Sequence, residues 1–367
     1  MIVLYILLAF LILGFMIAVH ETGHYLAAKA LKFKVEEFSI GLGKAIYKKK
    51  RKNGEVFSLR LIPLGGFCMF AGDDDLDRKL TGEKAVSNSF ELEKKEEDYI
   101  PFNKQPPWKR LIVLAAGGFA NLICAVVFAV IFLMVFGYFH NIKVTELDPN
   151  VANNPFLKGD IIQEIDGKKF TFTDSFGAQM EKYNKVGDTF EVTVQRKVNG
   201  VMTTVKFDVT LNRAASSSGR YSDYGGIGDL KQEWVSMSFG GALGKTWQFT
   251  GELIWFMLQF LGKLITGQIS LFDIGGPFTT VSIMSEVMAN QGLYYFLLFI
   301  PLISVNLGVF NLLPVPALDG GRMAFVGLEW VRKKPVNPNI EGRVHMIGLF
   351  VILGLILFLD ISYLFFR

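Results

Sequence analysis

The chain has 367 residues, of which 51% are hydrophobic and only 20% are charged, and its mean hydropathy is +0.34. This composition excludes a disordered protein and disfavours an ordinary soluble enzyme, so a large part of the chain is expected to meet lipid. The net charge of +4 is too small for a nucleic-acid-binding protein. The two cysteines, Cys68 and Cys124, exclude a disulfide framework and a cysteine-rich zinc module.

Four stretches are long and apolar enough to cross a bilayer as helices. Residues 1–19 and 111–139 carry no charge, 288–318 is uncharged but interrupted by prolines, and 344–366 contains one acid. Each covers the roughly 20 residues that a helix needs to cross hydrocarbon. The first stretch lacks a basic start and a small-residue cleavage site, which favours a retained helix over a signal peptide.

Basic residues concentrate in two of the loops between these stretches. One loop carries the run at 48–52, and the other carries Arg332, Lys333 and Lys334. Loops rich in lysine and arginine stay in the cytoplasm. We therefore expect a multi-pass protein of the cytoplasmic (inner) membrane with both termini, and residues from about 140 to 245, outside the cytoplasm.

Residues 246–265 need a separate interpretation because Glu252 and Lys263 interrupt an otherwise apolar segment. Only ten uncharged residues lie between these two charges, too few to cross a membrane. Trp247 and Trp255 are side chains typical of the membrane–water interface. The segment is therefore predicted to be an amphipathic helix on the outer interface.

Residues 20–24 read His-Glu-Thr-Gly-His. Four residues of helix turn by about 400°, so His20 and His24 share one face and can occupy two positions on a tetrahedral zinc ion. Glu21 then lies beside the ion, where it can hold and deprotonate a water molecule. The alternative is that these side chains simply pair inside a helix bundle. Ionisable groups at the end of a membrane helix are costly, which favours the functional interpretation.

A zinc hydrolase needs a third protein ligand. The remaining histidines, His140 and His345, do not lie in polar clusters, whereas Asp319 ends a long apolar stretch and precedes two glycines. Taken alone, Asp319 is explained equally well as a helix-end acid that faces water. If residues 246–265 crossed the membrane, the span that follows would run in the opposite direction. Asp319 would then lie at the other face of the membrane, about 30 Å from His20. The prediction that Asp319 shares a metal ion with His20 and His24 therefore requires the prediction that residues 246–265 do not cross the membrane.

With these motifs the chain resembles the site-two proteases, a family of intramembrane zinc metalloproteases. Within this family it resembles the bacterial type that has an extracytoplasmic PDZ domain (the regulator of sigma-E protease type). The family signatures are His-Glu-x-x-His in the first span and Asn-x-x-Pro-x-Pro-x-Leu-Asp-Gly, which stands here at 311–320. Residues 102–121 resemble its second-span motif, except that Gly118 stands where proline is usual. The resemblance covers essentially the whole chain.

The resemblance assigns roles to individual residues. It implies zinc ligation by His20, His24 and Asp319, with Glu21 as general base. It implies that the residues engaging substrate near the scissile bond are Asn311, Pro314 and Pro316. Asn121 is implied as a support of the site.

The sequence that follows the first span predicts a β-hairpin, with strands at 38–47 and 56–64 and a turn through Asn53-Gly54. One interpretation is a small surface hairpin. The resemblance implies instead a re-entrant sheet on the cytoplasmic side, whose edge at 64–69 pairs with an extended substrate. This edge contains three further candidate substrate-binding residues, Gly65, Gly66 and Phe67.

Residues 140–213 are more polar and alternate like strands at 189–195 and 203–210, with an Asn199-Gly200 turn between them. Residues 158–167 resemble the strand–turn core of a PDZ domain, which binds peptides by strand addition. A plain β-rich spacer is the alternative. As a PDZ domain outside the cytoplasm, this region would filter substrates that have bulky extracytoplasmic parts.

The predicted fold is a multipass α-helical membrane protein with four transmembrane helices, a cytoplasmic-side re-entrant β-hairpin and one extracytoplasmic β-rich PDZ domain. In chain order the expected segments are a first transmembrane helix at 1–32, a cytoplasmic loop with the hairpin at 33–106, a second transmembrane helix at 107–139, the PDZ domain and linker at 140–230, the interfacial helix at 240–268, a third transmembrane helix with the Leu-Asp-Gly motif at 288–322 and a fourth at 344–367. The active site is expected toward the cytoplasmic face.

The resemblance implies a zinc metalloendopeptidase that cleaves transmembrane segments of single-span proteins in regulated intramembrane proteolysis. Its substrates would be pre-trimmed anti-sigma factors or remnant signal peptides. The protein would lie in a lipid bilayer and would bind no nucleic acid. One alternative is a non-catalytic PDZ-bearing membrane scaffold with a structural or empty metal site, which has no use for Glu21. The other is a transporter, which is disfavoured because the hydropathy pattern does not repeat.

Overall fold

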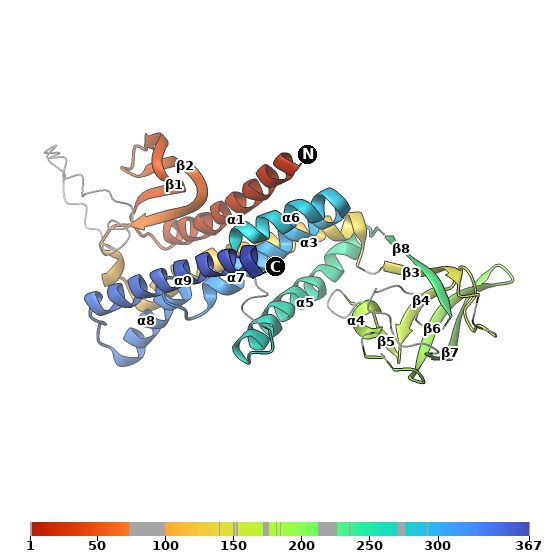
Figure 1. The fold of residues 1–367 in the computed structure, drawn as a ribbon. Helices are drawn as coiled ribbons and strands as arrows, with labels where there is room; N and C mark the ends of the chain where they lie inside the picture. The colour runs from red at the N-terminus through yellow and green to blue at the C-terminus, as the bar shows by residue number, and fades with distance from the viewer. Residues whose placement is uncertain are drawn as a thin grey trace, which may run out of the picture. The chain divides into compact units, whose positions relative to one another are not determined.

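A computed structural model describes residues 2–366 except 73–99, 139, 150, 152, 172–175, 181, 184, 212–225, 235, 270–275 and 292. The chain divides into two compact units. The first contains Met1–Phe128 and Met257–Arg367, and the second is Ala129–Phe256. Figure 1 shows the helices and the two sheets that these units contain.

Helices dominate the first unit. They are α1 (Ile2–Ala30), most of α3 (Pro107–Phe136), α6 (Pro277–Gln291), α7 (Leu293–Leu312), α8 (Asp319–Arg332) and α9 (Pro338–Phe366), with the short 3-10 helix η1 (Phe102–Lys104) before α3. Among the described residues, three helical segments are long and apolar enough to cross a membrane, namely Leu4–Ala30, Pro107–Phe136 and Pro338–Ser362. These segments overlap the first, second and last predicted spans, and they support the prediction that the chain is a membrane protein.

The predicted third span, residues 288–322, is not a single helix. Its residues belong to the end of α6, to α7 and to the start of α8. Because Pro314 and Pro316 lack the backbone N–H that a helix needs, α7 ends at Leu312 and an extended connection leads to α8. The apolar part of α7 that is described in full, Leu297–Leu312, is shorter than a usual span. A fourth crossing therefore stays a prediction.

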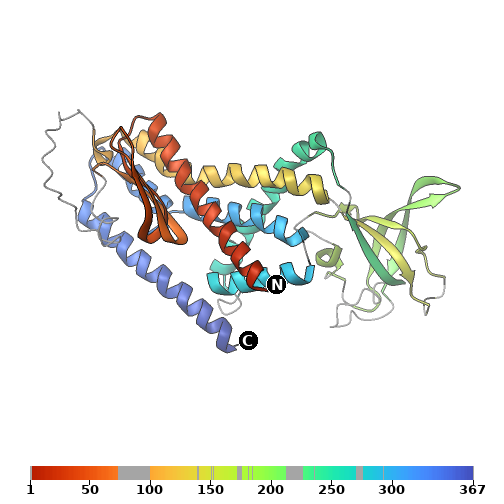
Figure 2. The same cartoon turned by 90° about the horizontal axis from the view of Figure 1, so that it is seen from above.

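The N-terminal half of α1 packs on α6 and α7. Met16 is fully buried there, with Ala9 and Ile12 on the same side of the helix and Met284 and Ile303 opposite. The C-terminal half of α1 instead lies beside a β-hairpin, as the two views in Figures 1 and 2 show. One apolar helix thus carries residues 20–24 between a helical layer and a sheet.

The hairpin consists of β1 (Val35–Lys50) and β2 (Val56–Phe70), which pair antiparallel as predicted. The strands curl strongly, since residues 35–40 pair with 66–70 on one side and with 56–59 on the other, while 45–50 pairs with 56–60. Positive φ angles at Gly41 (+89°) and Gly65 (+114°), which favour glycine, allow the bends. The curl leaves residues 66–70 at one outer edge of the sheet.

The second unit is built on a six-stranded sheet. The strands are β3 (His140–Leu147), β4 (Ile161–Ile165), β5 (Lys168–Lys169), β6 (Thr189–Val198), β7 (Val201–Thr210) and β8 (Ile227–Trp234), in the order β7-β6-β4-β3-β8 with β5 beside β4. The unit also contains α4 (Phe176–Met180) and most of α5 (Phe239–Ile265). Asn199 and Gly200, both at positive φ, form the predicted turn between β6 and β7. A β-rich region is thus present, and its identification as a PDZ domain stays a prediction.

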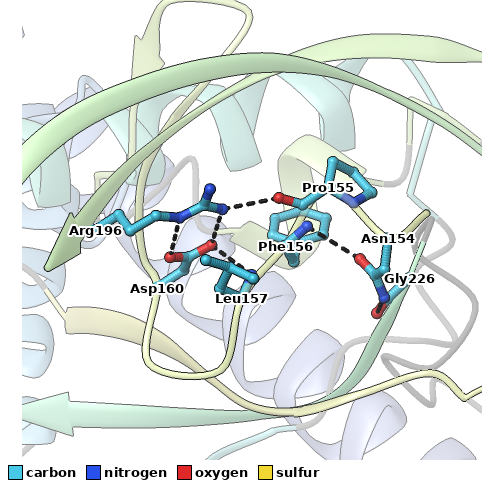
Figure 3. Close-up of polar contacts among 7 residues, drawn as sticks. All are labelled: Asn154, Pro155, Phe156, Leu157, Asp160, Arg196 and Gly226. Carbon is cyan, nitrogen blue, oxygen red and sulfur yellow. Dashed lines mark hydrogen bonds and ion pairs between the residues drawn. The ribbon is translucent and has the colours of Figure 1, made fainter. Parts of the chain in front are cut away.

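An ion pair between the buried Asp160 and the half-buried Arg196 stabilises the turn before β4 (Figure 3). Arg196 on β6 donates to both carboxylate oxygens of Asp160, at 2.8 and 2.6 Å, and to the carbonyl oxygen of Pro155 at 2.8 Å. Asp160 also accepts the N–H of Leu157 at 2.8 Å. These partners offset the cost of burying the carboxylate and hold residues 155–160 against the sheet.

Candidate metal centre

Two histidines of α1 present their ring nitrogens to the same point. His20 and His24 lie one helical turn apart, both are buried, and their rings pack edge to face with centroids 4.7 Å apart. Their Nε2 atoms are 3.2 Å from each other. The helical period therefore places two potential ligand atoms side by side.

Asp319, the first residue of α8, completes the cluster from the far end of the sequence. Its Oδ2 lies 3.0 Å from Nε2 of His20 and 3.1 Å from Nε2 of His24. These three atoms form the candidate metal cluster among the described residues. Ligands about 2.0–2.1 Å from a tetrahedral ion are themselves about 3.3 Å apart, so the donor set and its spacing fit zinc.

Hydrogen bonds behind the rings orient both imidazoles. Nδ1 of His24 lies 2.8 Å from the carbonyl oxygen of Val113, so this nitrogen carries a proton, and in the neutral ring Nε2 is left with a lone pair. Nδ1 of His20 lies 3.5 Å from the side-chain amide of the fully buried Asn121. The Oδ1 atom of this amide has no hydrogen-bond partner among the described residues. A half-turn of the amide makes Oδ1 the acceptor for Nδ1–H and frees Nε2 of His20 as well.

With these tautomers, three acceptor atoms face one another. Neither Nε2 atom then has a hydrogen to share with Asp319, and their lone pairs point toward a carboxylate about 3 Å away. Buried acceptors facing one another need positive charge between them, either a proton that makes one imidazole cationic or a bound metal ion. All three atoms can bind a metal ion at once, so the orientation of the rings fits a metal site.

Helix α3 can approach these rings because it has a glycine there. A Cβ on Gly117 would clash with the ring of His24 and lie 2.7 Å from Cε1 of His20. On α1, a Cβ on Gly23 would lie 2.6 Å from Cβ of Ala120. Sequence reasoning recognised Gly117 only as part of a motif, and it missed the carbonyl of Val113, which no side-chain pattern reveals.

The outer edge of the hairpin reaches Glu21. A Cβ on Gly66 would lie 2.8 Å from Cγ of Glu21 and 2.9 Å from the carbonyl oxygen of Ser39. Gly66 therefore allows the strand to lie directly on the side chain of the candidate general base. The structure brings Gly66 to the site, with Gly65 and Phe67 as its chain neighbours.

A buried polar network supports this edge. The guanidinium of Arg60 stacks on the ring of Phe67 at 4.9 Å and donates to Glu37 at 2.9 Å and to Ser39 at 3.1 Å. Burial raises the pKa of Glu37, but hydrogen bonds from Ser58 and Arg60 outweigh burial and hold it below its usual value. The carboxylate therefore stabilises the hairpin at neutral pH, and this contribution is lost as the pH falls through the lowered pKa.

The other predicted substrate residues precede Asp319. Asn311 lies in the last turn of α7, and Pro314 and Pro316 lie in the extended connection. Pro314 is exposed, while Asn311 and Pro316 are half-buried. These positions are close in sequence to the metal cluster, and contact with a substrate stays a prediction.

Comparison with known proteins agrees with this geometry. The sequence pattern of Peptidase family M50 matches residues 8–355. The regulator of sigma-W protease RasP of Bacillus subtilis is 29% identical over 417 residues, which cover 95% of this chain and 96% of that protein. The zinc metalloprotease RasP of Oceanobacillus iheyensis is 28% identical over 92% of this chain and 93% of its own. A candidate zinc metalloprotease of Agrobacterium fabrum is 31% identical over 96% of this chain and 94% of its own.

Proposed function

Because the chain belongs to Peptidase family M50, and is therefore a metalloprotease of the membrane, we propose that its active site is formed by His20, His24, Asp319 and Glu21. The observation that carries this proposal is the spacing of 3.0–3.2 Å among the three acceptor atoms. These atoms would hold zinc, the metal for which the Agrobacterium fabrum and Oceanobacillus iheyensis relatives are named. When bound, zinc supplies Lewis-acid chemistry at the scissile carbonyl and at a water molecule.

Glu21 is proposed as the general base. It follows His20 on α1, so its carboxylate lies beside the cluster without being one of the three ligands. It takes a proton from the water that attacks the carbonyl carbon and passes this proton to the amine nitrogen when the C–N bond breaks. The same side chain thus serves both halves of peptide hydrolysis.

The proposed substrate is an extended segment bound to the outer edge of the hairpin. A membrane helix keeps its carbonyl groups hydrogen-bonded, so it must unwind before its backbone can be cut. Among the described residues, 66–70 pairs on one side with 35–40, which leaves the other side for strand addition. Since Gly66 lies on Glu21, a segment paired there would place its carbonyl groups close to the metal cluster. Asn311, Pro314 and Pro316 are proposed to contact the same segment.

The proposed substrates are single-span membrane proteins, either pre-trimmed anti-sigma factors or remnant signal peptides, cut in regulated intramembrane proteolysis. The Bacillus subtilis relative is named a regulator of sigma-W protease, so anti-sigma factors are the first class to test. We further propose that the six-stranded sheet belongs to an extracytoplasmic PDZ domain that filters substrates, and that α5 lies on the outer membrane interface.

The decisive variant is Glu21→Gln. Purified protein would be assayed for zinc content and for cleavage of a single-span substrate, with Thr22→Ser as a control on the same helix. We expect Glu21→Gln to keep zinc and to lose about 10²–10⁴-fold in kcat, because general acid–base catalysis contributes that much. Thr22→Ser keeps the hydroxyl group that donates to the carbonyl oxygen of Ala18, so its activity should be unchanged.

Two results would contradict this assignment. Undiminished cleavage by Glu21→Gln removes the residue from the mechanism. Zinc in the wild-type protein without cleavage of any single-span substrate favours the alternative, a non-catalytic scaffold with a structural metal site.

A further inference from the structure

The connection between α7 and α8, residues 313–318, packs closely against Gly321 of α8 and against Gly348 of α9. At the start of α8, a Cβ on Gly321 would lie 3.0 Å from the carbonyl carbon of Val315. On α9, a Cβ on Gly348 would lie 2.9 Å from the carbonyl carbon of Pro316. The connection therefore has little room to move between the two helices.

Within this connection, Ala317 has an unusual backbone conformation. Its φ angle is +74°, in the left-handed region that residues with a Cβ rarely adopt. Ala317 is two residues before Asp319, so its φ angle sets the direction in which α8 and the carboxylate begin. Something outside the connection must favour this conformation.

His345 on α9 makes a hydrogen bond that favours this conformation of Ala317. The N–H of Ala317 donates to Nδ1 of His345 at 3.0 Å, one helical turn from the contact of Gly348 with Pro316. Since Nδ1 is the acceptor, a neutral ring carries its proton on Nε2. This Nε2 is buried and has no hydrogen-bond partner among the described residues. The ring also packs against Phe325 of α8, with centroids 5.6 Å apart.

The unpartnered nitrogen shows that a histidine is a costly choice at this position. An ionisable side chain in a helix long enough to cross a membrane is retained for a role that an apolar residue cannot fill. Here that role is acceptance of the Ala317 N–H, because the backbone carbonyls of α9 are used within the helix.

We propose that His345 is a positioning residue that holds Ala317 in its left-handed conformation and thereby fixes Asp319 at the metal cluster. The inference rests on the proposed function, in which Asp319 is a zinc ligand. It assigns to α9 a part in metal binding although α9 supplies no ligand.

A pair of variants tests the hydrogen bond separately from packing. In His345→Asn, the side-chain Oδ1 occupies nearly the place of Nδ1 and can accept the same N–H, whereas His345→Leu fills similar space without an acceptor. Zinc affinity would be measured in the full-length protein by competition with a chelator, together with kcat, KM and thermal unfolding. We expect His345→Leu to weaken zinc binding about 10–100-fold and to lower kcat with KM unchanged. His345→Asn should stay close to wild type.

A second variant keeps the test valid if His345→Leu is poorly folded. Glycine adopts the left-handed conformation without a steric cost, so Ala317→Gly in the His345→Leu background should restore part of the zinc affinity. Wild-type zinc affinity in His345→Leu, equal losses in the leucine and asparagine variants, or no restoration by Ala317→Gly would each overturn the inference.

Asp319→Asn distinguishes this inference from the proposed function. If Asp319→Asn retains zinc as the wild type does, the proposed ligand set is wrong and the role of His345 is lost with it. If Asp319→Asn loses zinc while His345→Leu retains it, only the role of His345 is wrong.

Discussion

At the scale of single residues, the metal centre depends on the hydrogen atom that Gly117 carries in place of a side chain. We expect Gly117→Ala to displace one or both imidazoles, because its Cβ would overlap the ring of His24 and approach His20. Such a shift should weaken zinc binding about 10–100-fold and reduce cleavage in parallel. Chelator competition and a cleavage assay on the same preparation measure both effects.

The matched control is Gly354→Ala on α9, where an added Cβ would meet no atom within 4 Å beyond its chain neighbours and the nearby backbone of its own helix, among the described residues. Alanine is the better helix former by about 1 kcal/mol, so this variant should be as stable as wild type or more so and should keep its zinc. If Gly117→Ala binds zinc as tightly as Gly354→Ala, the close approach of α3 to the rings is not needed for the site.

The sequence predicts those residues whose relationship is periodic or local. His20, Glu21 and His24 follow from the helical period, and the proximity of Asp319 to them was expected from a motif and a topological argument. Two further contacts at the site involve backbone groups, namely the carbonyl of Val113 and the N–H of Ala317. No residue type encodes these groups, so from the sequence alone His345 lies outside any polar cluster.

At the scale of elements, the hairpin depends on Arg60 in two separable ways. The guanidinium pairs with the buried Glu37, and it also stacks on Phe67 in the outer edge at 66–70, where substrate is proposed to bind. We expect Arg60→Met to destabilise the protein by about 1.5–3 kcal/mol, because the buried carboxylate of Glu37 loses a charged hydrogen-bond donor and keeps only Ser58 and Lys48 among its contacts with the described residues. It should also raise KM for a single-span substrate, since the edge loses its support. Thermal unfolding and steady-state kinetics would measure the two effects.

The double variant Glu37→Gln with Arg60→Met separates these effects. It removes both buried charges, so much of the stability should return. The increase in KM should persist, because Phe67 still lacks the guanidinium. A KM that recovers together with stability would show that Arg60 has no role in positioning the edge.

The hairpin also shows why the architecture of an element is harder to predict than its existence. Alternation and the Asn53-Gly54 turn predict two antiparallel strands, and the structure has them. The curl, in which residues 35–40 pair on both sides, depends on glycines at positive φ and on contacts distant in sequence. In the opposite case, a continuous apolar stretch at 288–318 predicts one helix, and the two prolines before Asp319 end that helix early.

At the scale of the whole molecule, the number of membrane crossings decides how Asp319 and His20 come to the same depth. The exposed residues Lys52 in the β1–β2 turn, Asn199 in the β6–β7 turn and Lys334 after α8 lie in three successive segments of the chain. Between the first two, α3 is the described helix that is long enough to cross. Between the second two lie α5, α6, α7 and α8, and we propose that α7 alone crosses.

Single cysteines at these three positions, in a chain with Cys68 and Cys124 replaced by serine, test this arrangement with a membrane-impermeant maleimide. In intact cells we expect Asn199→Cys to react, while Lys52→Cys and Lys334→Cys react only after the membrane is opened, because basic loops stay in the cytoplasm. Retained zinc and cleavage would show that each variant is folded.

Each alternative pattern has a definite meaning. If Lys334→Cys labels from outside together with Asn199→Cys, then α7 does not cross by itself, and the four-helix topology is wrong. If Lys52→Cys labels from outside and Asn199→Cys does not, the orientation is inverted and the active site faces the other compartment. Because Asp319 lies 3.0 Å from His20 in either case, labelling tests the membrane topology without depending on the metal site.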